Sequence, residues 1–190
     1  MKPLFITFEG LDGSGKSTHL QWAGEWLRDR GLPVHVTKEP GGTPLGDAIR
    51  GVFLDPQWGK VEGRVEALMV FASRRQHLVE LIEPALAAGE HVLCDRFTDS
   101  SIAYQGSGRG LPAGWVEALD QLVTDGRRPD LTLLFDLPAE MATFTTASPL
   151  AKAIFTALVP AMSPRSRVAI WKVAASSLGP LTFRPVVIRS

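Results

Sequence analysis

The stretch Gly10 to Thr18, with the sequence GLDGSGKST, has the residue types and the spacing of a loop that binds phosphate. In the pattern G-x-x-x-x-G-K-[ST], glycines let backbone N–H groups approach an anion, the lysine places a charge on the β- and γ-phosphates, and the next hydroxyl is an expected Mg²⁺ ligand. The alternative is a chance glycine turn with a solvated lysine. The residues predicted to bind a nucleoside triphosphate are Gly10, Leu11, Asp12, Gly13, Ser14, Gly15, Lys16, Ser17 and Thr18.

The segments on either side of this loop favour the phosphate-binding interpretation. Leu4 to Phe8 is an apolar, β-rich run that predicts a buried strand, and residues 19–27 carry large apolar side chains at helical spacing. Strand, loop and helix together direct the positive end of the helix dipole towards the anion.

Further along the chain, short apolar runs alternate with helical patterns. Strands are predicted at 34–37, 91–95 and 131–135, and helices at 45–54, 65–86 and 112–125. The segment 65–86 is either one long helix or two abutting ones, with a kink near Pro84. The alternation predicts an α/β fold of the P-loop NTPase type, with a central parallel sheet between two helical layers. Ligands bind beyond the carboxyl ends of such strands, where Gly10, Glu39, Asp95 and Asp136 gather.

The composition excludes several classes of protein. The chain has 190 residues, enough for one α/β domain, and its formal net charge of zero gives no reason to expect nucleic acid or a membrane surface as a partner. It has no signal-peptide pattern and no apolar run of transmembrane length. Its one cysteine, Cys94, is predicted to lie in a buried strand and forms no intramolecular disulfide. We therefore expect a soluble cytoplasmic protein.

The composition changes near residue 140. All 20 acidic residues lie at or before that position, whereas the last 50 residues carry six basic ones, Lys152, Arg165, Arg167, Lys172, Arg184 and Arg189. Ordinary soluble domains mix both signs on their surface. We therefore divide the chain into a core, residues 1–140, and an atypical tail, residues 141–190. The tail is expected in place of a lid and the last elements of the sheet. The tail is either a basic accessory segment or the product of a shifted reading frame, and 185–188 could form a final strand.

Four segments of the core resemble the thymidylate kinases, a family of P-loop nucleoside monophosphate kinases. They are the stretches 8–18, 39–45, 71–75 and 95–110, the last with the sequence DRFTDSSIAYQGSGRG. The resemblance covers about residues 3 to 140. It implies transfer of the γ-phosphoryl group of ATP to the 5′-phosphate of dTMP, with Mg²⁺ as cofactor, in a homodimer that pairs through long helices. Apolar stretches in 65–88 allow such pairing.

The resemblance also implies a role for individual residues. Arg50 and Arg96 would clamp the acceptor phosphate, although Arg50 on its own could be a surface residue. Phe71 would stack on the thymine and Arg75, four residues on, would hydrogen-bond its edge; without the resemblance, Phe71 reads as plain core. Family positions near the nucleotide are matched by Glu39, Ser101, Tyr104 and Gln105, of which Tyr104 is a hypothetical barrier to a ribose 2′-OH.

Three residues of the loop and strand ends are the predicted catalytic group: Lys16, Asp12 and Arg96. Asp12 would contact the acceptor nucleotide, for example its 3′-OH, or else stabilise the loop through an Asx hydrogen bond. Ser17 and Asp95 are the predicted metal residues, Asp95 acting through water or only fixing Arg96.

One departure from the family bears on activity. Relatives without an arginine between the first and last glycines of the loop carry arginines in a lid after the fourth strand, and here Met141 to Leu150 has none. We therefore expect an intact dTMP site but weakened or absent turnover. The alternatives are a kinase for another nucleotide and a non-catalytic P-loop protein that binds nucleotide. A GTPase is disfavoured because no N-K-x-D motif is present.

Overall fold

The computed structural model describes residues 2–136, 168–174 and 182–188. Its centre is a sheet in the order β2-β3-β1-β4-β5-β6, parallel throughout except for the antiparallel β5–β6 pair. The strands are β1 (Phe5–Gly10), β2 (Val34–Lys38), β3 (His91–Asp95), β4 (Leu131–Asp136), β5 (Val168–Ala174) and β6 (Thr182–Ile188). The predicted parallel sheet is confirmed, and β6 covers the strand predicted at 185–188.

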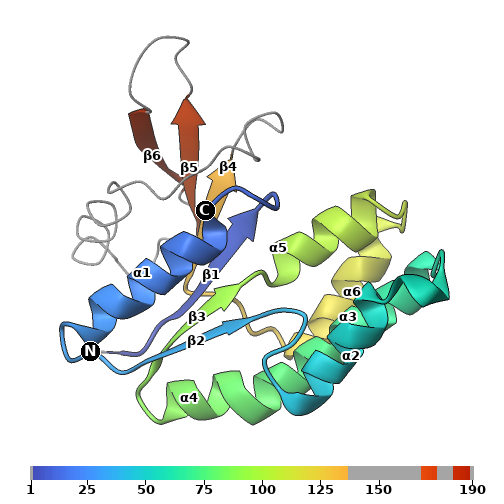
Figure 1. The fold of residues 1–190 in the computed structure, drawn as a ribbon, viewed down its shortest axis with the longest axis horizontal. Coiled ribbons are helices and arrows are strands. Elements are labelled where there is room, and N and C mark those ends of the chain that lie inside the picture. The colour runs from blue at the N-terminus through green and yellow to red at the C-terminus, as the bar shows by residue number, and fades with distance from the viewer. Residues whose placement is uncertain (1, 137–167, 175–181, 189–190) are drawn as a thin grey trace.

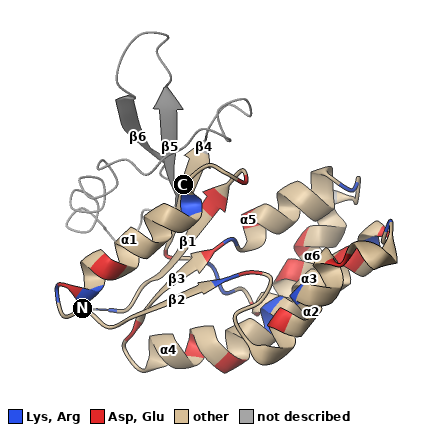
Figure 2. Ribbon diagram, in the orientation of Figure 1, with Lys and Arg blue, Asp and Glu red and all other residues tan. Residues whose placement is uncertain are grey.

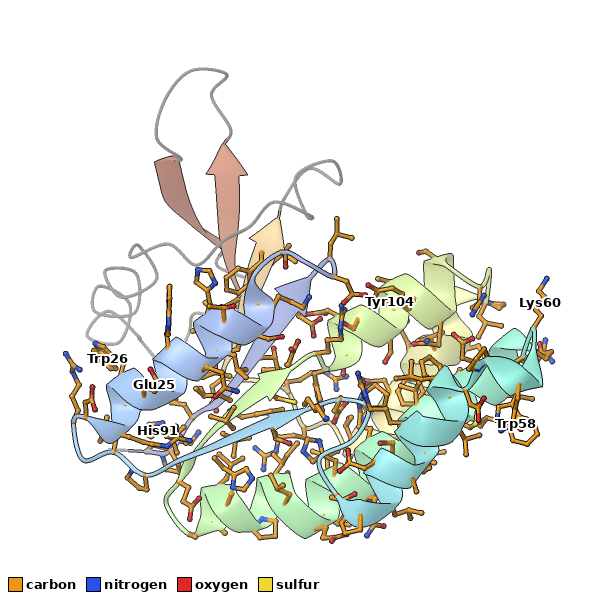
Figure 3. All side chains as sticks on the ribbon, in the orientation of Figure 1. Glu25, Trp26, Trp58, Lys60, His91 and Tyr104 are labelled. Atoms are coloured by element: carbon orange, nitrogen blue, oxygen red, sulfur yellow. The ribbon has the colours of Figure 1, made fainter. Side chains whose placement is uncertain are left out.

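Helices cover both faces of the sheet, as Figure 1 shows. The α-helices are α1 (Lys16–Arg28), α2 (Pro44–Leu54), α3 (Gly63–His77), α4 (Glu83–Ala87), α5 (Thr98–Ser101) and α6 (Ala113–Thr124). Shorter 3₁₀ and π-helical segments are η1 (Pro56–Trp58), η2 (Leu78–Ile82) and η3 (Ile102–Ser107). Figure 3 labels Trp58 at the far end of the α2–α3 connection, away from the strand ends.

Alternation along β1 explains the two layers. Ile6 and Phe8 pack in a cluster with Leu20 and Trp26 of α1, whereas Phe5 packs on the opposite face against Ile82 of η2. Successive side chains of a strand point to opposite faces, so a strand with large apolar side chains on both faces must be covered on both sides. The predicted three-layer α/β/α arrangement of the P-loop NTPases is therefore confirmed.

The structure specifies two segments that the sequence leaves open. The predicted helix 65–86 is α3, a π-helical turn and α4 in continuous succession, and the π-helical turn ends just before Pro84. Residues 98–107, which the sequence leaves open between a loop and a helix, form α5 and η3. Among the described residues no helix combines the length and apolarity needed to cross a bilayer. The predicted lid segment 141–150 lies outside the described residues, as does most of 141–190.

Candidate functional site

The loop after β1 has the backbone geometry of a phosphate cradle. Gly10 has a φ of +136°, and a Cβ atom there would lie 2.5 Å from the backbone oxygen of Phe135 on β4, so only glycine fits. Gly15 is left-handed, with φ +84°, and caps α1 without a side-chain hydrogen bond. The N–H groups at the start of α1 therefore stay available for an anion.

Lys16 is folded back onto its own loop. Its Nζ donates to the backbone oxygen of Leu11 over 2.6 Å, and the residue is buried. Burial, together with the nearby charge of Arg96, lowers the pKa of Lys16 from its ordinary value. An ammonium group that is costly to bury without an anion is well suited to bind phosphate at this position.

Ser17 and Asp95, the two predicted metal residues, lie side by side. The Ser17 hydroxyl donates to Asp95 Oδ2 over 2.7 Å, and this joins α1 to the end of β3. Asp95 Oδ1 is buried with no hydrogen-bond partner, and a buried carboxylate oxygen needs a positive or donating partner. A hydroxyl and a carboxylate with an unused oxygen fit Mg²⁺ held largely through water. Within the described residues no group of three or more His, Cys, Asp and Glu side chains could hold a metal ion by itself.

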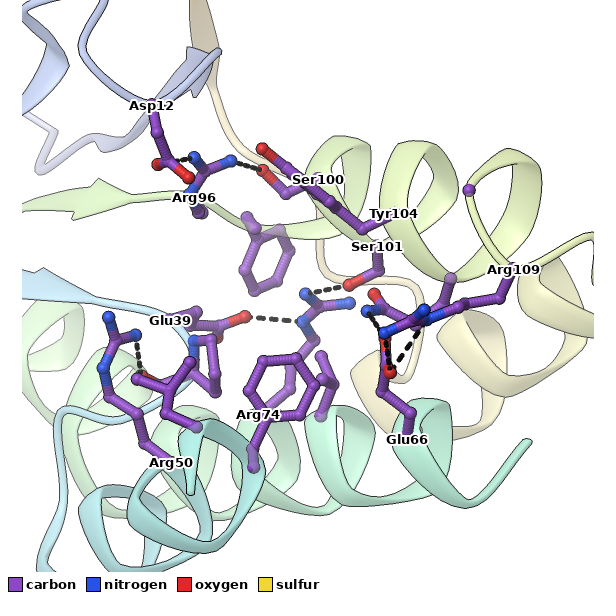
Figure 4. A pocket seen from close by; sticks show the side chains of 17 residues that line it. Asp12, Glu39, Arg50, Glu66, Arg74, Arg96, Ser100, Ser101, Tyr104 and Arg109 are labelled. Carbon is purple, nitrogen blue, oxygen red and sulfur yellow. Dashed lines mark hydrogen bonds and ion pairs between the residues drawn. The ribbon is translucent and has the colours of Figure 1, made fainter. Parts of the chain in front are cut away.

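Arg96 points from the end of β3 towards the phosphate loop. Its Nη2 donates to Asp12 Oδ1 over 2.6 Å and its Nη1 donates to Ser100 Oγ over 3.0 Å, as Figure 4 shows. Its φ is +72°, which few residues other than glycine adopt, and its N–H donates to the backbone oxygen of Phe8. Burial opposes its charge, but the hydrogen bond to Asp12 raises the pKa of Arg96 above its ordinary value.

Glu9 supports this turn and was not identified from the sequence. Its Oε1 accepts from the N–H of Phe97 over 2.7 Å, and its Oε2 accepts from the hydroxyl of Ser100, the same hydroxyl that Arg96 contacts. Burial raises the pKa of Glu9 to about 7, against the lowering effect of the Ser100 hydrogen bond. The available signal was an acid at the end of an otherwise apolar strand.

A cavity of about 450 Å³ opens between the strand ends and the helices α2, α3 and η3. This volume lies in the range of small-molecule sites. Figure 2 shows charged residues of both signs around the carboxyl ends of β1 and β3. Predicted residues that line the cavity are Asp12, Glu39, Arg50, Arg96, Ser101, Tyr104 and Gln105.

Both residues predicted for the acceptor phosphate, Arg50 and Arg96, line this cavity. Arg50 donates from Nη1 to the backbone oxygen of Pro40 over 3.0 Å, which directs the α2 arginine inward. Tyr104, labelled in Figure 3, lies with its ring centre 5.0 Å from the guanidinium carbon of Arg96. Two arginines and a tyrosine from three separate elements therefore line one cavity with Asp12 of the phosphate loop.

Phe71 and Arg75, the two residues predicted to bind the base, do not line the cavity. Phe71 is 1 % exposed and packs with Ala67 and Val116 between α3 and α6, which matches its reading as plain core. Arg75 is turned to the far side of α3, where its Nη1 donates to Asp125 Oδ2 over 2.6 Å. The α3 residues that line the cavity are instead Glu66, Val70 and Arg74, of which the last two each precede a predicted residue by one position. The three are spaced four positions apart and therefore share one face of the helix.

Arg74 is a second charged residue of the site that was not identified from the sequence. It is 1 % exposed, with its guanidinium carbon 4.8 Å from the ring centre of Phe71 and 4.6 Å from that of Phe97. Its Nε donates to Glu39 Oε2 over 2.7 Å and its Nη2 donates to Ser101 Oγ over 2.9 Å. Glu39 thus orients a cavity arginine from the end of β2. The sequence did contain a signal for this role, because Arg74 stands next to Arg75 in the stretch 71–75 that resembles the family.

The remaining contact of Glu39 is to a buried histidine. His77 Nδ1 lies 3.0 Å from Glu39 Oε1, and His77 Nε2 lies 2.8 Å from Thr37 Oγ1. Both oxygens of this buried carboxylate are therefore satisfied, which holds the strand end β2 against α3.

Comparison with known proteins agrees with this geometry. A family model described as thymidylate kinase matches residues 8–144. A thymidylate kinase of Neisseria gonorrhoeae is 54 % identical over 142 residues, which are 75 % of this chain and 68 % of the relative. One of Cupriavidus metallidurans is 47 % identical over 186 residues, 98 % of this chain and 90 % of the relative. A crystal structure of thymidylate kinase from Ehrlichia chaffeensis matches with a TM-score of 0.69 at 34 % identity, covering 90 % of each chain.

The family named in these matches fits the geometry of the site, which has a phosphate loop, a cavity beyond the strand ends and an arginine between the two. This chain belongs to the thymidylate kinase family.

Proposed function

We propose that the chain phosphorylates dTMP to dTDP with ATP as the phosphate donor. The observation that carries the proposal is the position of Arg96, which reaches from the cavity to Asp12 in the phosphate loop. A guanidinium group at this junction contacts both the donor and the acceptor side. The family match and the relatives named thymidylate kinase support this reading.

Each part of the reaction has its own residues in the proposal. Lys16 and the N–H groups of the loop hold the β- and γ-phosphates of ATP, and Arg50 and Arg96 hold the 5′-phosphate of dTMP. An oxygen of that phosphate attacks the γ-phosphorus, the bond to the bridging oxygen of ATP breaks, and ADP leaves. The arginines reduce the repulsion between two anions that must approach closely.

The base and the sugar occupy the rest of the cavity. Arg74 and Gln105 hydrogen-bond the edge of the thymine, Val70 packs against its face, and Ser101 contacts it through the hydroxyl group. Asp12 binds the sugar, and the ring of Tyr104 fills the space of a ribose 2′-OH. A 450 Å³ cavity with a few polar groups on an apolar wall supports this assignment.

Mg²⁺ is the proposed cofactor, held by Ser17 and through water by Asp95. When bound, it neutralises charge on the β- and γ-phosphates. The unpartnered oxygen of Asp95 supports this part of the proposal.

The proposal is tested by release of ADP from ATP with dTMP as acceptor, alongside dUMP, dCMP, dGMP and deoxynucleosides. ADP release that depends on dTMP, and that Lys16→Met abolishes, supports the proposal. A stronger response to another acceptor would support instead a kinase for a different nucleotide.

A second candidate is nucleotide binding without turnover. The absence of arginine from Met141 to Leu150 and from the phosphate loop favours it. Binding of ATP and dTMP in calorimetry without any ADP release would establish this second function.

We further propose a homodimer that pairs through α2 and α3, in the cytoplasm. Exposed apolar side chains on and next to these helices support the pairing: Leu45, Val52, Leu54, Val65, Leu68 and Val79. The free thiol of Cys94 in β3 fits a reducing compartment. Light scattering after gel filtration tests the pairing, and a Leu68→Arg variant that stays dimeric would contradict this interface.

A further inference from the structure

Glu66 is a buried acid in the first turn of α3 whose contacts all lie at the cavity. Its Oε1 accepts from Gln105 Nε2 over 3.0 Å, and its Oε2 accepts from Nε and Nη2 of Arg109 over 2.9 and 2.7 Å, as Figure 4 shows for Arg109. Glu66 is 5 % exposed and lines the cavity together with both partners. It therefore joins α3 to η3 and to the turn after it.

These contacts determine which end of the Gln105 amide faces the acid. A carboxylate only accepts hydrogen bonds, so Gln105 must present its NH₂ group to Glu66. None of the side-chain hydrogen bonds within residues 2–136 uses Gln105 Oε1, and that oxygen is not among the buried atoms without a partner. The carbonyl end of the amide is therefore left for a ligand in the cavity.

Arg109 makes this arrangement stable. A buried carboxylate is costly unless it is paired and hydrogen-bonded, and Arg109 supplies two donors to the oxygen that Gln105 does not use. Glu66 can therefore remain a charged acceptor next to Gln105.

We propose that Glu66 sets the base selectivity of the acceptor site by orienting Gln105 with its carbonyl oxygen towards the base; this inference rests on the proposed dTMP kinase function. Thymine carries a donor at N3 and an acceptor at O4, which match the oxygen of Gln105 and the donors of Arg74. Cytosine carries an acceptor at N3 and a donor at its 4-amino group, so both contacts oppose like groups. Glu66 is thus a positioning residue that discriminates against cytosine without touching the base.

The test compares dTMP and dCMP in the wild-type chain and in Glu66→Gln. A glutamine at position 66 donates as well as accepts, so Gln105 is free to turn its NH₂ group to the base. We expect the ratio of dTMP to dCMP affinity, measured by calorimetry, to fall about tenfold, the equivalent of one hydrogen bond, mainly through stronger dCMP binding. The same ratio of kcat/KM values should fall in parallel.

Glu62→Gln is the matched control. Glu62 precedes Glu66 by one turn, accepts from the N–H groups of Arg64 and Val65 and is exposed, so the variant removes the same charge without affecting Gln105. Its dTMP to dCMP ratio should stay at the wild-type value.

If Glu66→Gln does not fold, Glu66→Asp provides a second measurement of the dTMP to dCMP ratio. It keeps the charge near Arg109 but is one methylene shorter, so it loses its contact with Gln105, and we expect the same fall in the ratio. A wild-type ratio in the folded Glu66 variants would overturn this inference and leave the kinase function standing. A wild-type chain that binds neither nucleotide would overturn both.

Discussion

Arg96 at the end of β3 donates to Asp12 of the phosphate loop over 2.6 Å, although the two residues are 84 positions apart in the chain. This contact joins the phosphate loop to the wall of the cavity. We predict that Arg96→Ala lowers kcat/KM for dTMP by about a hundredfold or more, because two charge-assisted hydrogen bonds are lost at the junction. The measurement is steady-state kinetics with ADP release. Arg75→Ala, which removes an arginine outside the cavity, should leave kcat/KM within about twofold.

Phe71 is predicted to act on stability and not on base recognition. Replacing Phe71 with Ala should lower the free energy of unfolding by about 3 to 5 kcal/mol, because the ring fills the space between α3 and α6. Phe71→Leu keeps most of that volume and should leave the dTMP KM near the wild-type value. Val70→Ala should instead raise this KM by about fivefold, since Val70 lines the cavity. Urea titrations and KM measurements separate the two effects, and a large rise in KM for Phe71→Leu would restore the stacking role.

Glu9 gives the folded chain a pH dependence with a defined sign. Its pKa is raised by burial from 4.5 to about 7, so the folded chain keeps a proton that the unfolded chain has released. Stability from this group is therefore full below about pH 4.5 and is lost as the pH rises to about 7, by roughly 3 kcal/mol in total. Asp99 reinforces this raised pKa and Arg96 opposes it.

The Glu9→Gln variant checks this directly. It cannot titrate, so its stability relative to the wild type should rise between about pH 4.5 and 7 when both are unfolded in urea. Glu25→Gln, a change of the same kind at an exposed position of α1, should give a curve parallel to that of the wild type. Parallel curves for Glu9→Gln as well would contradict the assignment.

The tail is predicted to limit turnover. Because Met141 to Leu150 carries no arginine, we expect kcat of this chain to be lower than that of an active relative by about a thousandfold, with dTMP binding retained. A chimera of residues 1–140 with a family-like C-terminus should regain turnover. Equal kcat values for the two chains would refute the prediction, and the DNA downstream of codon 140 tests the shifted reading frame.

The sheet and the phosphate loop could be predicted because each depends on local chemistry. The run Leu131 to Phe135 is apolar at four of its five positions, with Thr132 as the exception, which predicts a strand covered on both faces. The phosphate loop is defined by its glycine positions. The residues that we propose to contact the base could not be placed in the same way. Whether Val70 or Phe71 faces the cavity depends on the rotation of α3 against α6, a property of packing between distant segments.

The choice between a loop and a helix after β3 also could not be made from the sequence. The three serines and the single glycine of 98–107 favour turns in isolation, but here Ser100 is held by Glu9 and Ser101 by Arg74, both from other elements. Such tertiary contacts override local preference. Glu9 and Glu66 escaped notice for a related reason: each acts on a neighbour, Ser100 or Gln105, and not on a ligand.

The guanidinium group of Arg74 is buried and also forms part of the cavity wall. It packs against the rings of Phe71 and Phe97 and donates a hydrogen bond to Glu39. Removing it leaves an acid without its partner in the interior, a loss of about 3 to 5 kcal/mol and a large part of what holds a domain of this size together. Most substitutions of Arg74 will therefore prevent folding, so they cannot yield a folded enzyme with a different nucleotide preference. Variants with altered nucleotide choice should accordingly arise first at rim positions such as Tyr104, where a replacement leaves the framework intact.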